Sequence, residues 1–443
     1  MQREVLYDPI HGIISFSSRE KRVIDHPFVQ RLRFIRQLGL KFLVYPGAVH
    51  DRFGHALGAM HLAGLVWSAL DEKHEVWRRL PPSTRKKLFE RFRFAALLHD
   101  LGHGPFSHAS EALMPRLDQL AIPKHWYERW RSSAQATHED YGALLLFTLS
   151  REPENVFTPA EAQDIASLLH KAILPSVEWR RLFRTEAEAK GYHRFLRRLI
   201  SGELDVDRMD YLLRDAHFTG VPYGKYDLPW LLQTMSAVVR QGCPSLVLHE
   251  RGLRTFEDFL LARYHMFLQV YFHRTTAIFE HYVERAIREG EIAVSIPSDP
   301  YAYAELRDSG VLEAMFQAGK DPRHRWSRLL LERQPMRLIL ATEGRDQNVE
   351  GRVRRVKSAL AAAGIKSVQR LAHRALSEPR LRLGASGIFI QKRFLDRLTL
   401  EPLEKVSTLL QKYNQQIYRQ YLYVWPEDYE RACGALHKVK GLR

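Results

Sequence analysis

The sequence predicts a mainly α-helical protein with a short N-terminal β-hairpin and a small C-terminal α+β region. Apolar residues recur with the 3.6-residue period of amphipathic helices from about residue 26 to residue 290. Before this stretch lies a short segment rich in β-branched and aromatic residues, and after it short β-like runs alternate with basic helices. A chain of 443 residues is long enough for two or three domains with a substantial core.

The N-terminal segment, residues 4–18, is expected to form the hairpin. Its β-branched and aromatic residues are interrupted by turn-forming pairs at residues 8–9 and 11–12. Within the helical region, residues 61–80 and 256–287 show clear amphipathic spacing. The second of these contains no glycine or proline, so it predicts either one long core helix or a closely linked pair of helices.

Strand-like segments alternate with basic helical segments toward the C-terminus. Residues 400–418 are an example of the predicted helices. The helical periodicity is broken by a proline-containing stretch at 291–300, where we expect a domain boundary. The interleaving predicts a small α+β unit attached to the helical core. The runs that we expect to form strands are 245–250, 336–342, 387–391 and 420–425.

The composition indicates a soluble protein of a reducing compartment. Only Cys243 and Cys433 are present, far apart, so no disulfide framework is expected. The first twelve residues contain no apolar core of a signal peptide. No run approaches the ~20 apolar residues that span a bilayer. We therefore expect a cytoplasmic protein without a membrane partner.

The chain carries a formal net charge of +16, which favours phosphate-bearing partners. Each basic cluster, taken alone, is equally consistent with a solvated helix face. Together they predict weak retention on nucleic acid at low salt, but they do not by themselves indicate a nuclease. The clusters lie at residues 85–94, 180–198, 351–357 and 437–443.

The most informative stretch is HDLGHGPFSH, residues 99–108, which follows an apolar helical run. The adjacent His99 and Asp100 supply an imidazole and a carboxylate from one short piece of backbone. This pair of donors suits a divalent ion such as Mn, Fe, Zn or Mg. His99 and His103 would share a helix face if the helix continued, although neighbouring glycines weaken that continuation.

Two further segments contribute candidate ligands. DRFGHALG contains His55, and ELDVDRMDYLLRD contains Asp207. Together with His99 and Asp100 they form the pattern H…HD…D, which predicts one divalent metal site built from three separate segments. The alternative for any single histidine is that it caps or packs against a helix.

These motifs resemble those of the HD-domain phosphohydrolases, and more narrowly the deoxynucleoside triphosphate triphosphohydrolase branch. The resemblance implies an HD-domain helical core over residues 1–290. Residues 291–443 match only loosely, and we assign them as a C-terminal α+β region for oligomerisation or regulation. The matching segments, in the family's order, are YDPIHG (7–12), DHPFVQRLRFIRQLG (25–39), YPGAVHDRFGHALG (45–58), HDLGHGPFSH (99–108), THED (137–140) and DVDRMDYLLRD (205–215).

The resemblance also implies catalytic roles. His108 would be the general acid, since an imidazole titrates near neutral pH. Glu111 and His138 would orient or reprotonate it, and His103 would lie against the phosphates. The alternative for His138 is an ordinary helix-start residue that follows the N-cap Thr137.

The family further implies a substrate site. Two arginines would bind phosphates, and four other residues would recognise a deoxyribose, with no room for a 2′-hydroxyl. Without the resemblance, the apolar and aromatic members could equally be core residues. The six residues are Gln37, Leu38, Arg52, Arg208, Tyr211 and Asp215.

One part of the substrate site departs from the family pattern. An arginine and a tyrosine that hold phosphate and close the sugar pocket are replaced here by Gln269 and Ala277. The sugar pocket is therefore expected to be looser, or to be closed by another residue such as Tyr271.

A second nucleotide site is suggested at Asp25, Gln30 and Arg33, which match residues that read a guanine in the family's activator site. Glu4 replaces a lysine of that site and places an unfavourable charge beside phosphate. The alternative is a helix cap with an ion pair. An activator nucleotide would imply nucleotide-driven homo-oligomerisation.

The sequence thus favours a metal-dependent dNTP triphosphohydrolase that releases deoxynucleoside and inorganic triphosphate. One alternative with the same chemistry is a nuclease or phosphodiesterase acting on nucleic acid or another nucleotide. A second alternative is a non-hydrolytic nucleotide or nucleic-acid sensor. A sensor would need neither the complete ligand set nor a general acid.

Overall fold

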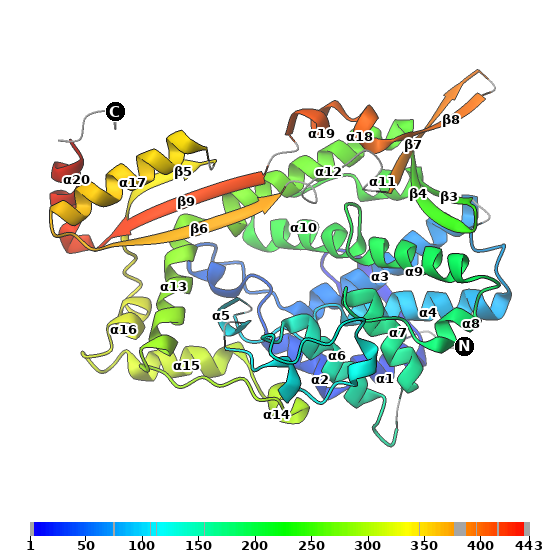
Figure 1. The fold of residues 1–443 in the computed structure, drawn as a ribbon, viewed down its shortest axis with the longest axis horizontal. Helices are drawn as coiled ribbons and strands as arrows, with labels where there is room; N and C mark the ends of the chain where they lie inside the picture. Colours follow the sequence, from blue (N-terminus) through cyan, green and yellow to red (C-terminus); the bar gives the residue numbers. More distant parts are fainter. Residues whose placement is uncertain are drawn as a thin grey trace.

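The computed structural model has a large helical body with smaller sheets, as the sequence predicted (Figure 1). An N-terminal hairpin packs on the helices, and two further sheets involve the C-terminal part of the chain. The residues that the structure describes are 4–73, 76–106, 108–111, 113–154, 156–344, 346–375, 387–395, 397–413 and 416–437.

The N-terminal hairpin is confirmed. Strands β1 (Glu4–Asp8) and β2 (Gly12–Phe16) pair antiparallel. The Asp8 carboxylate closes the turn by accepting hydrogen bonds from the backbone N–H groups of Ile10 and His11, each at 2.9 Å. This local bonding explains why an Asp-Pro pair marks the turn.

Four helices carry the predicted site motifs at or beside one end. They are α3 (Arg52–Lys73), α4 (Pro82–Leu98), α6 (His138–Leu149) and α10 (Val206–Thr219). Side-chain caps define two of these ends, because Thr137 caps α6 and Asp205 caps α10. Helix α3 packs against both α4 and α10, so the three helix ends are brought together. The remaining helices of this body are α1 (Ser18–Ile24), α2 (Pro27–Gln30), α5 (His108–Glu111), α7 (Pro159–Leu169), α8 (Val177–Arg181), α9 (Glu186–Ile200) and α11 (Leu228–Thr234).

The long helical stretch predicted at 256–287 is a closely linked pair of helices. Helix α12 (Leu253–Met266) continues into a π-helical turn at Phe267–Tyr271, and α13 (Arg274–Arg288) follows. The side chain of His273 caps α13 by accepting a hydrogen bond from the backbone N–H of Thr275. The wider turn before this cap therefore interrupts a sequence that has no helix-breaking residue.

Two sheets complete the fold. One has the order β3-β4-β7-β8, in which β4 and β7 are parallel neighbours. The other has the order β5-β9-β6 and is antiparallel. The strands are β3 (Met235–Arg240), β4 (Cys243–His249), β5 (Arg337–Glu343), β6 (Ser367–Ala375), β7 (Ile388–Phe394), β8 (Arg397–Pro402) and β9 (Gln416–Val424).

All four predicted strands are found, as β4, β5, β7 and β9, whereas β3, β6 and β8 were not predicted. The helix predicted over 400–418 is wrong at both ends. Its first residues belong to β8 and its last to β9, which leaves only two short helices between them. Sheet pairing, which depends on distant segments, overrides the local helical pattern. The helices of this part are α14 (Pro300–Ala304), α15 (Asp308–Ala318), α16 (Arg325–Leu331), α17 (Gln347–Ala362), α18 (Leu403–Val406), α19 (Thr408–Tyr413) and α20 (Tyr429–His437).

The boundary at residue 290 stays a prediction. The β4–β7 pairing joins a strand from each side of it.

Contrary to the sequence expectation, one helix among the described residues, Arg52–Asp71 in α3, is long and apolar enough to cross a membrane. Its most apolar stretch is 67% buried within the protein, which is the pattern of a core helix.

Acid should destabilise this fold partly through His193 on α9. Burial, helped by the nearby Arg197, lowers the pKa of His193 to about 4, against about 6.5 in an unfolded chain. The unfolded state therefore binds the extra proton first, so the free energy of unfolding should fall as the pH drops from about 6.5 to about 4, by at most about 1.4 kcal/mol per pH unit for this group. His193→Gln should show a shallower fall in urea titrations across this range. An unchanged pH dependence would contradict the assignment.

Candidate metal centre and active site

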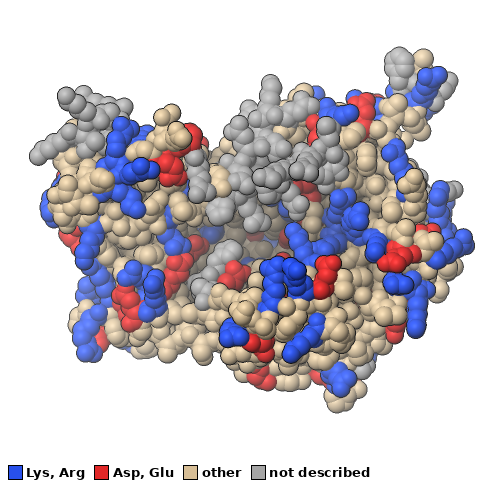
Figure 2. Space-filling model, viewed as in Figure 1, with Lys and Arg blue, Asp and Glu red and all other residues tan. Residues whose placement is uncertain are grey.

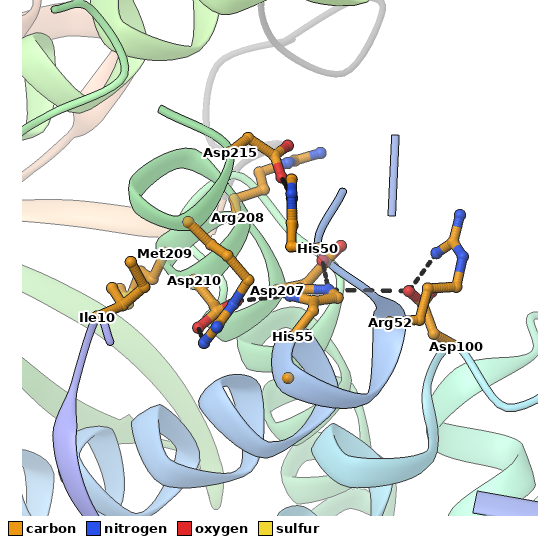
Figure 3. Close-up of polar contacts among 12 residues, drawn as sticks. Ile10, His50, Arg52, His55, Asp100, Asp207, Arg208, Met209, Asp210 and Asp215 are labelled. Atoms are coloured by element: carbon orange, nitrogen blue, oxygen red, sulfur yellow. Dashed lines mark hydrogen bonds and ion pairs between the residues drawn. The ribbon is translucent and has the colours of Figure 1, made fainter. Parts of the chain in front are cut away.

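Three of the four predicted ligands, His55, His99 and Asp207, have ligand atoms within 4.8 Å of one another where α3, the end of α4 and α10 meet, and Asp100 lies beside them. Figure 3 shows His55, Asp100 and Asp207 facing one another. The Nε2 atom of His55 lies 3.0 Å from Nε2 of His99 and 3.1 Å from Oδ1 of Asp207. Nε2 of His99 lies 3.5 Å from the same Asp207 oxygen and 3.4 Å from Oδ1 of Asp100. Two donor atoms bound at about 2.1 Å to one ion, at tetrahedral or right angles, lie about 3.0–3.4 Å apart.

The hydrogen-bond partners of the two imidazoles fit a cation at this site. Nδ1 of His55 faces the Asp210 carboxylate at 2.7 Å, and Nδ1 of His99 faces the carbonyl of Ala96 at 2.8 Å. Each Nδ1 must therefore carry the proton, which leaves a lone pair on each Nε2. When each Nε2 is deprotonated, its lone pair points toward the other ring and toward the Asp207 carboxylate. A divalent cation relieves the repulsion among these groups, and the donor set suits one.

The electrostatics favour positive charge at the same point. Burial opposes protonation of His55, but its bonds to Asp207 and Asp210 outweigh burial and raise its pKa to about 10. Burial likewise opposes ionisation of Asp100, yet the Arg52 guanidinium and the adjacent imidazoles hold the pKa of that carboxyl well below its usual range. The site therefore holds carboxylates that attract a metal ion in competition with protons.

The loop that follows His99 is fixed by contacts to its carbonyl groups. The Arg31 guanidinium donates to the carbonyls of Leu101 and His103, at 3.0 and 2.7 Å. The Tyr303 hydroxyl donates to the carbonyl of Gly102 at 2.7 Å. Helix α4 ends at Leu98, so the predicted histidines approach one another through this loop and not along a continued helix.

The predicted catalytic residues form a second cluster beside the metal ligands. The imidazoles of His103 and His138 are stacked with their centroids 4.0 Å apart, and His138 is hydrogen-bonded to Glu111. Nε2 of His103 also lies 3.3 Å from Asp100. Burial and the charge of Arg52 lower the pKa of His103 to about 3. The side chain of His108, the predicted general acid, lies outside the described part of the structure.

The two predicted phosphate-binding arginines differ in their surroundings. Arg52 begins α3, as the helical interpretation of its segment required, and its guanidinium pairs with Asp100 inside the site. Nη1 of Arg208 lies 3.5 Å from Asp205 and 4.0 Å from Glu203. The guanidinium of Arg208 thus lies beside two neighbouring carboxylates.

The predicted sugar-site residues gather around Asp215. Its two carboxylate oxygens are bonded to His50 at 2.8 Å and to the hydroxyl of Tyr271 at 2.7 Å. The ring of Tyr211 lies between Tyr271 and the metal ligands, with centroids 6.0 Å from Tyr271 and 6.4 Å from His55. The backbone N–H of Gln37 donates to the carbonyl of His50 at 3.0 Å, which brings that segment to the same place.

Two details of this group bear on ligand binding. Oε1 of Gln37 and Nδ1 of His50 are buried, and neither has a hydrogen-bond partner among the residues that the structure describes. The neighbouring Leu38 is buried in the main core cluster. Tyr271 belongs to the π-helical turn, and its hydroxyl donates to Asp215. Its role in closing the sugar pocket stays a prediction.

The residues of the predicted activator site form local contacts near the surface. Asp25 pairs with Lys21 at 2.8 Å, in the manner of a helix cap with an ion pair. Gln30 accepts a hydrogen bond from Arg33, whose guanidinium lies over the ring of Phe53. These contacts match the alternative given for these residues, and the activator role stays a prediction.

Sequence reasoning missed Asp210, on α10, and its partners His11 and Arg214. Burial opposes ionisation of Asp210, but Arg214, His11 and His55 together hold its pKa well below the usual range of an aspartate. Two signals were available, namely the third acid of DVDRMD and the histidine of DPIHG.

The comparisons with known families identify the class of protein. Residues 52–215 match the HD domain, and residues 227–364 match the HD associated region. The chain therefore belongs to the HD-domain phosphohydrolases that carry an HD-associated region, as the motifs predicted. This family implies a divalent metal, and the residues that meet at the candidate centre fit one.

The relatives span bacteria, archaea and vertebrates. The uncharacterized protein YwfO of Bacillus subtilis is 31% identical over 342 residues, which cover 72% of this chain and 67% of that protein. The uncharacterized protein MJ1154 of Methanocaldococcus jannaschii is 31% identical, over 64% of this chain and 49% of its own. The human deoxynucleoside triphosphate triphosphohydrolase SAMHD1 is 28% identical over 78% of this chain and 55% of its own. The chain spans about half to two thirds of the length of these relatives.

Solved structures share the fold over nearly the whole chain. A hypothetical protein from Aquifex aeolicus has a TM-score of 0.72 at 25% identity and covers 98% of this chain and 100% of its own. A phosphohydrolase from Bacteroides thetaiotaomicron has a TM-score of 0.68 at 23% identity, covering 96% and 100%.

Proposed function

We propose that this protein is a metal-dependent dNTP triphosphohydrolase that releases deoxynucleoside and inorganic triphosphate. The observation that carries the proposal is the meeting of two imidazoles and two carboxylates from three segments, beside Arg52 and the Asp215 group. Similarity to the SAMHD1 enzymes supports the choice of dNTPs among phosphate esters.

Each residue of the site has a proposed role in binding the metal or the phosphates. His55, His99, Asp100 and Asp207 would hold the metal, which when bound supplies charge neutralisation and an activated water. Arg52 would bind the phosphates on the side of Asp100, and Arg208 would do so on release from Asp205. His103 stays neutral near pH 7, so it can donate or accept a hydrogen bond at a phosphate oxygen.

The proton for the leaving 5′-oxygen is assigned to His108, with His138 and Glu111 as its support. The hydrogen bond between His138 and Glu111 keeps the imidazole oriented. Gln37, Leu38, Tyr211 and Asp215 would bind the deoxyribose. Tyr271 would close the sugar pocket through its bond to Asp215.

Nuclease or phosphodiesterase activity is the second candidate, because the net charge of +16 favours polyanions. Figure 2 shows basic side chains over much of one face, interspersed with acidic ones and without a single continuous stripe. A non-hydrolytic sensor would need no second imidazole cluster beside its metal site.

One incubation separates these functions. Metal-replete protein is mixed with each dNTP, each NTP and end-labelled single-stranded DNA, and the products are resolved by chromatography. Deoxynucleoside plus triphosphate is the expected result. Shortened DNA would identify a nuclease, and unchanged substrates with tight binding would identify a sensor.

Arg52→Ala should raise the KM for dNTPs by about ten-fold or more, since a charge-assisted phosphate contact is worth about 1.5–3 kcal/mol. Arg52→Lys should recover part of this loss, because the lysine ammonium keeps the positive charge but lacks the paired N–H donors of the guanidinium. Steady-state kinetics at fixed metal concentration measure both. An unchanged KM in Arg52→Ala would remove Arg52 from the phosphate site.

As part of the same proposal, the protein is cytoplasmic and forms a homo-oligomer through residues 291–443. It includes activation by a nucleotide at Asp25, Gln30 and Arg33. The proposed metal is Mn, Mg, Fe or Zn, because each of these ions can bind a site built from imidazole and carboxylate ligands.

A further inference from the structure

The buried Asp210 joins the metal site to the N-terminal hairpin. Its carboxylate is fully buried on α10. Oδ2 accepts from Nδ1 of His55 at 2.7 Å and from Nε of Arg214 at 2.8 Å. Oδ1 accepts from Nε2 of His11 at 2.7 Å and from Nη2 of Arg214 at 2.9 Å.

These four hydrogen bonds use the whole accepting capacity of one carboxylate. Every partner of Asp210 must therefore donate. For His55 this means that Nδ1 carries a proton, so that Nε2, which faces His99 and Asp207, is the only ring nitrogen that a metal can bind. The ring is held in both tautomer and orientation before any ion arrives.

The hairpin turn takes part in the same network. One oxygen of Asp8 closes the turn through the backbone N–H groups of Ile10 and His11, and the other accepts from Nη1 of Arg214 at 2.8 Å. Asp8 thus positions His11 and Arg214, and both position Asp210. The side chains of His11 and Arg214 are 4% and 2% exposed, so water competes little for these bonds.

The packing around Asp210 leaves no freedom for another arrangement. A Cβ on Gly58 of α3 would lie 1.8 Å from Oδ1 of Asp210 and 2.5 Å from Nη2 of Arg214. Only glycine permits α3 to approach α10 this closely. His55 and Gly58 lie one turn apart on α3, so the same approach that seats Asp210 also brings its oxygen to His55.

We infer that Asp210, His11 and the turn at residues 8–11 form an outer shell of the metal centre and set its affinity through the tautomer of His55. The hairpin is then a part of the site, although none of its residues contacts the four ligands in the described structure except through Asp210. This inference rests on the proposed function only in requiring a divalent metal at His55.

The test is the affinity for Mn²⁺ alone, measured by isothermal titration calorimetry on the full chain. In Asp210→Asn, an amide N–H₂ group replaces one carboxylate oxygen and faces the two donors that were bonded to that oxygen. This variant should weaken Mn²⁺ binding by about 10–100-fold. His11→Ala, which removes one donor at the periphery and leaves the core packed, should weaken binding several-fold. Neither variant removes a metal ligand.

Asp164→Asn is the matched control. Asp164 is also fully buried and bonded to Arg91 at 2.8 Å, but it contacts no metal-site residue. It should lower stability while leaving Mn²⁺ affinity unchanged. If both Asp210→Asn and His11→Ala bound Mn²⁺ with wild-type affinity, the inference about the outer shell would be overturned, while the proposed metal centre would stand. Absence of Mn²⁺ binding by the wild type would overturn the proposed metal centre itself.

Discussion

His99→Ala is expected to abolish both divalent-metal binding and hydrolysis. Nε2 of His99 lies within 3.0–3.5 Å of donor atoms on His55, Asp100 and Asp207, so its removal opens one side of the cluster. The remaining donors still repel one another, and the loss of one ligand weakens binding by orders of magnitude. The turnover with dNTPs should fall below detection, whereas the fold should persist.

The control for this variant is His281→Ala on α13, which also removes a largely buried imidazole. Burial lowers the pKa of His281 to about 4, so it is neutral at pH 7, as His99 must be when it binds a metal. His281→Ala should cost stability without changing metal content, measured by elemental analysis after dialysis. Full activity in His99→Ala would show that the site is misassigned.

Gly102→Ala is expected to have the largest effect on the structure around the site. A Cβ at Gly102 would lie 1.9 Å from the backbone oxygen of His138 and 2.3 Å from the backbone nitrogen of Gly142. Backbone atoms inside a packed helix cannot yield cheaply. We expect a loss of about 3 kcal/mol in the free energy of unfolding, at the upper end of overpacking costs.

The same clash should move His138 away from His103 and reduce turnover at fixed metal occupancy. Gly351→Ala is the control, because Gly351 lies inside α17 with nothing within 4 Å of its would-be Cβ. It should stabilise by up to about 1 kcal/mol through helix propensity. Denaturant unfolding measures both variants. Equal stabilities for Gly102→Ala and wild type would contradict the packing of this loop.

The metal ligands could be predicted because their chemistry is local. The His99-Asp100 doublet and the segments around His55 and Asp207 carry recognisable motifs, and the Asp205 side chain caps the helix that presents Asp207. The family and the helical class followed from the same motifs. The roles of His103, His138 and Glu111 remain predictions, although the structure places their side chains together.

What the sequence could not predict depends on packing between distant segments. Asp210 is one helical turn beyond Asp207, and nothing local says that α3 approaches there closely enough for the Asp210 carboxylate to reach His55.

Unpredicted strands have the same explanation. Strand β6 pairs with β9, which lies far along the chain. Strand β8 pairs with its neighbour β7, and β7 in turn pairs with the distant β4, so the extended conformation depends on sheet partners that the local pattern does not show. The local pattern at 400–418 is helical, yet both of its ends join sheets. Tyr271 lies in a π-helical turn and is hydrogen-bonded to Asp215. Whether it closes the sugar pocket, as the sequence suggested, stays a prediction.

The most direct test of the metal centre is anomalous diffraction from crystals grown with Mn²⁺. A single strong peak is expected within about 2.0–2.3 Å of Nε2 of His55, Nε2 of His99 and carboxylate oxygens of Asp100 and Asp207. A strong peak elsewhere, or its absence at these four side chains in metal-saturated protein, would contradict the proposed centre and the hydrolysis built on it.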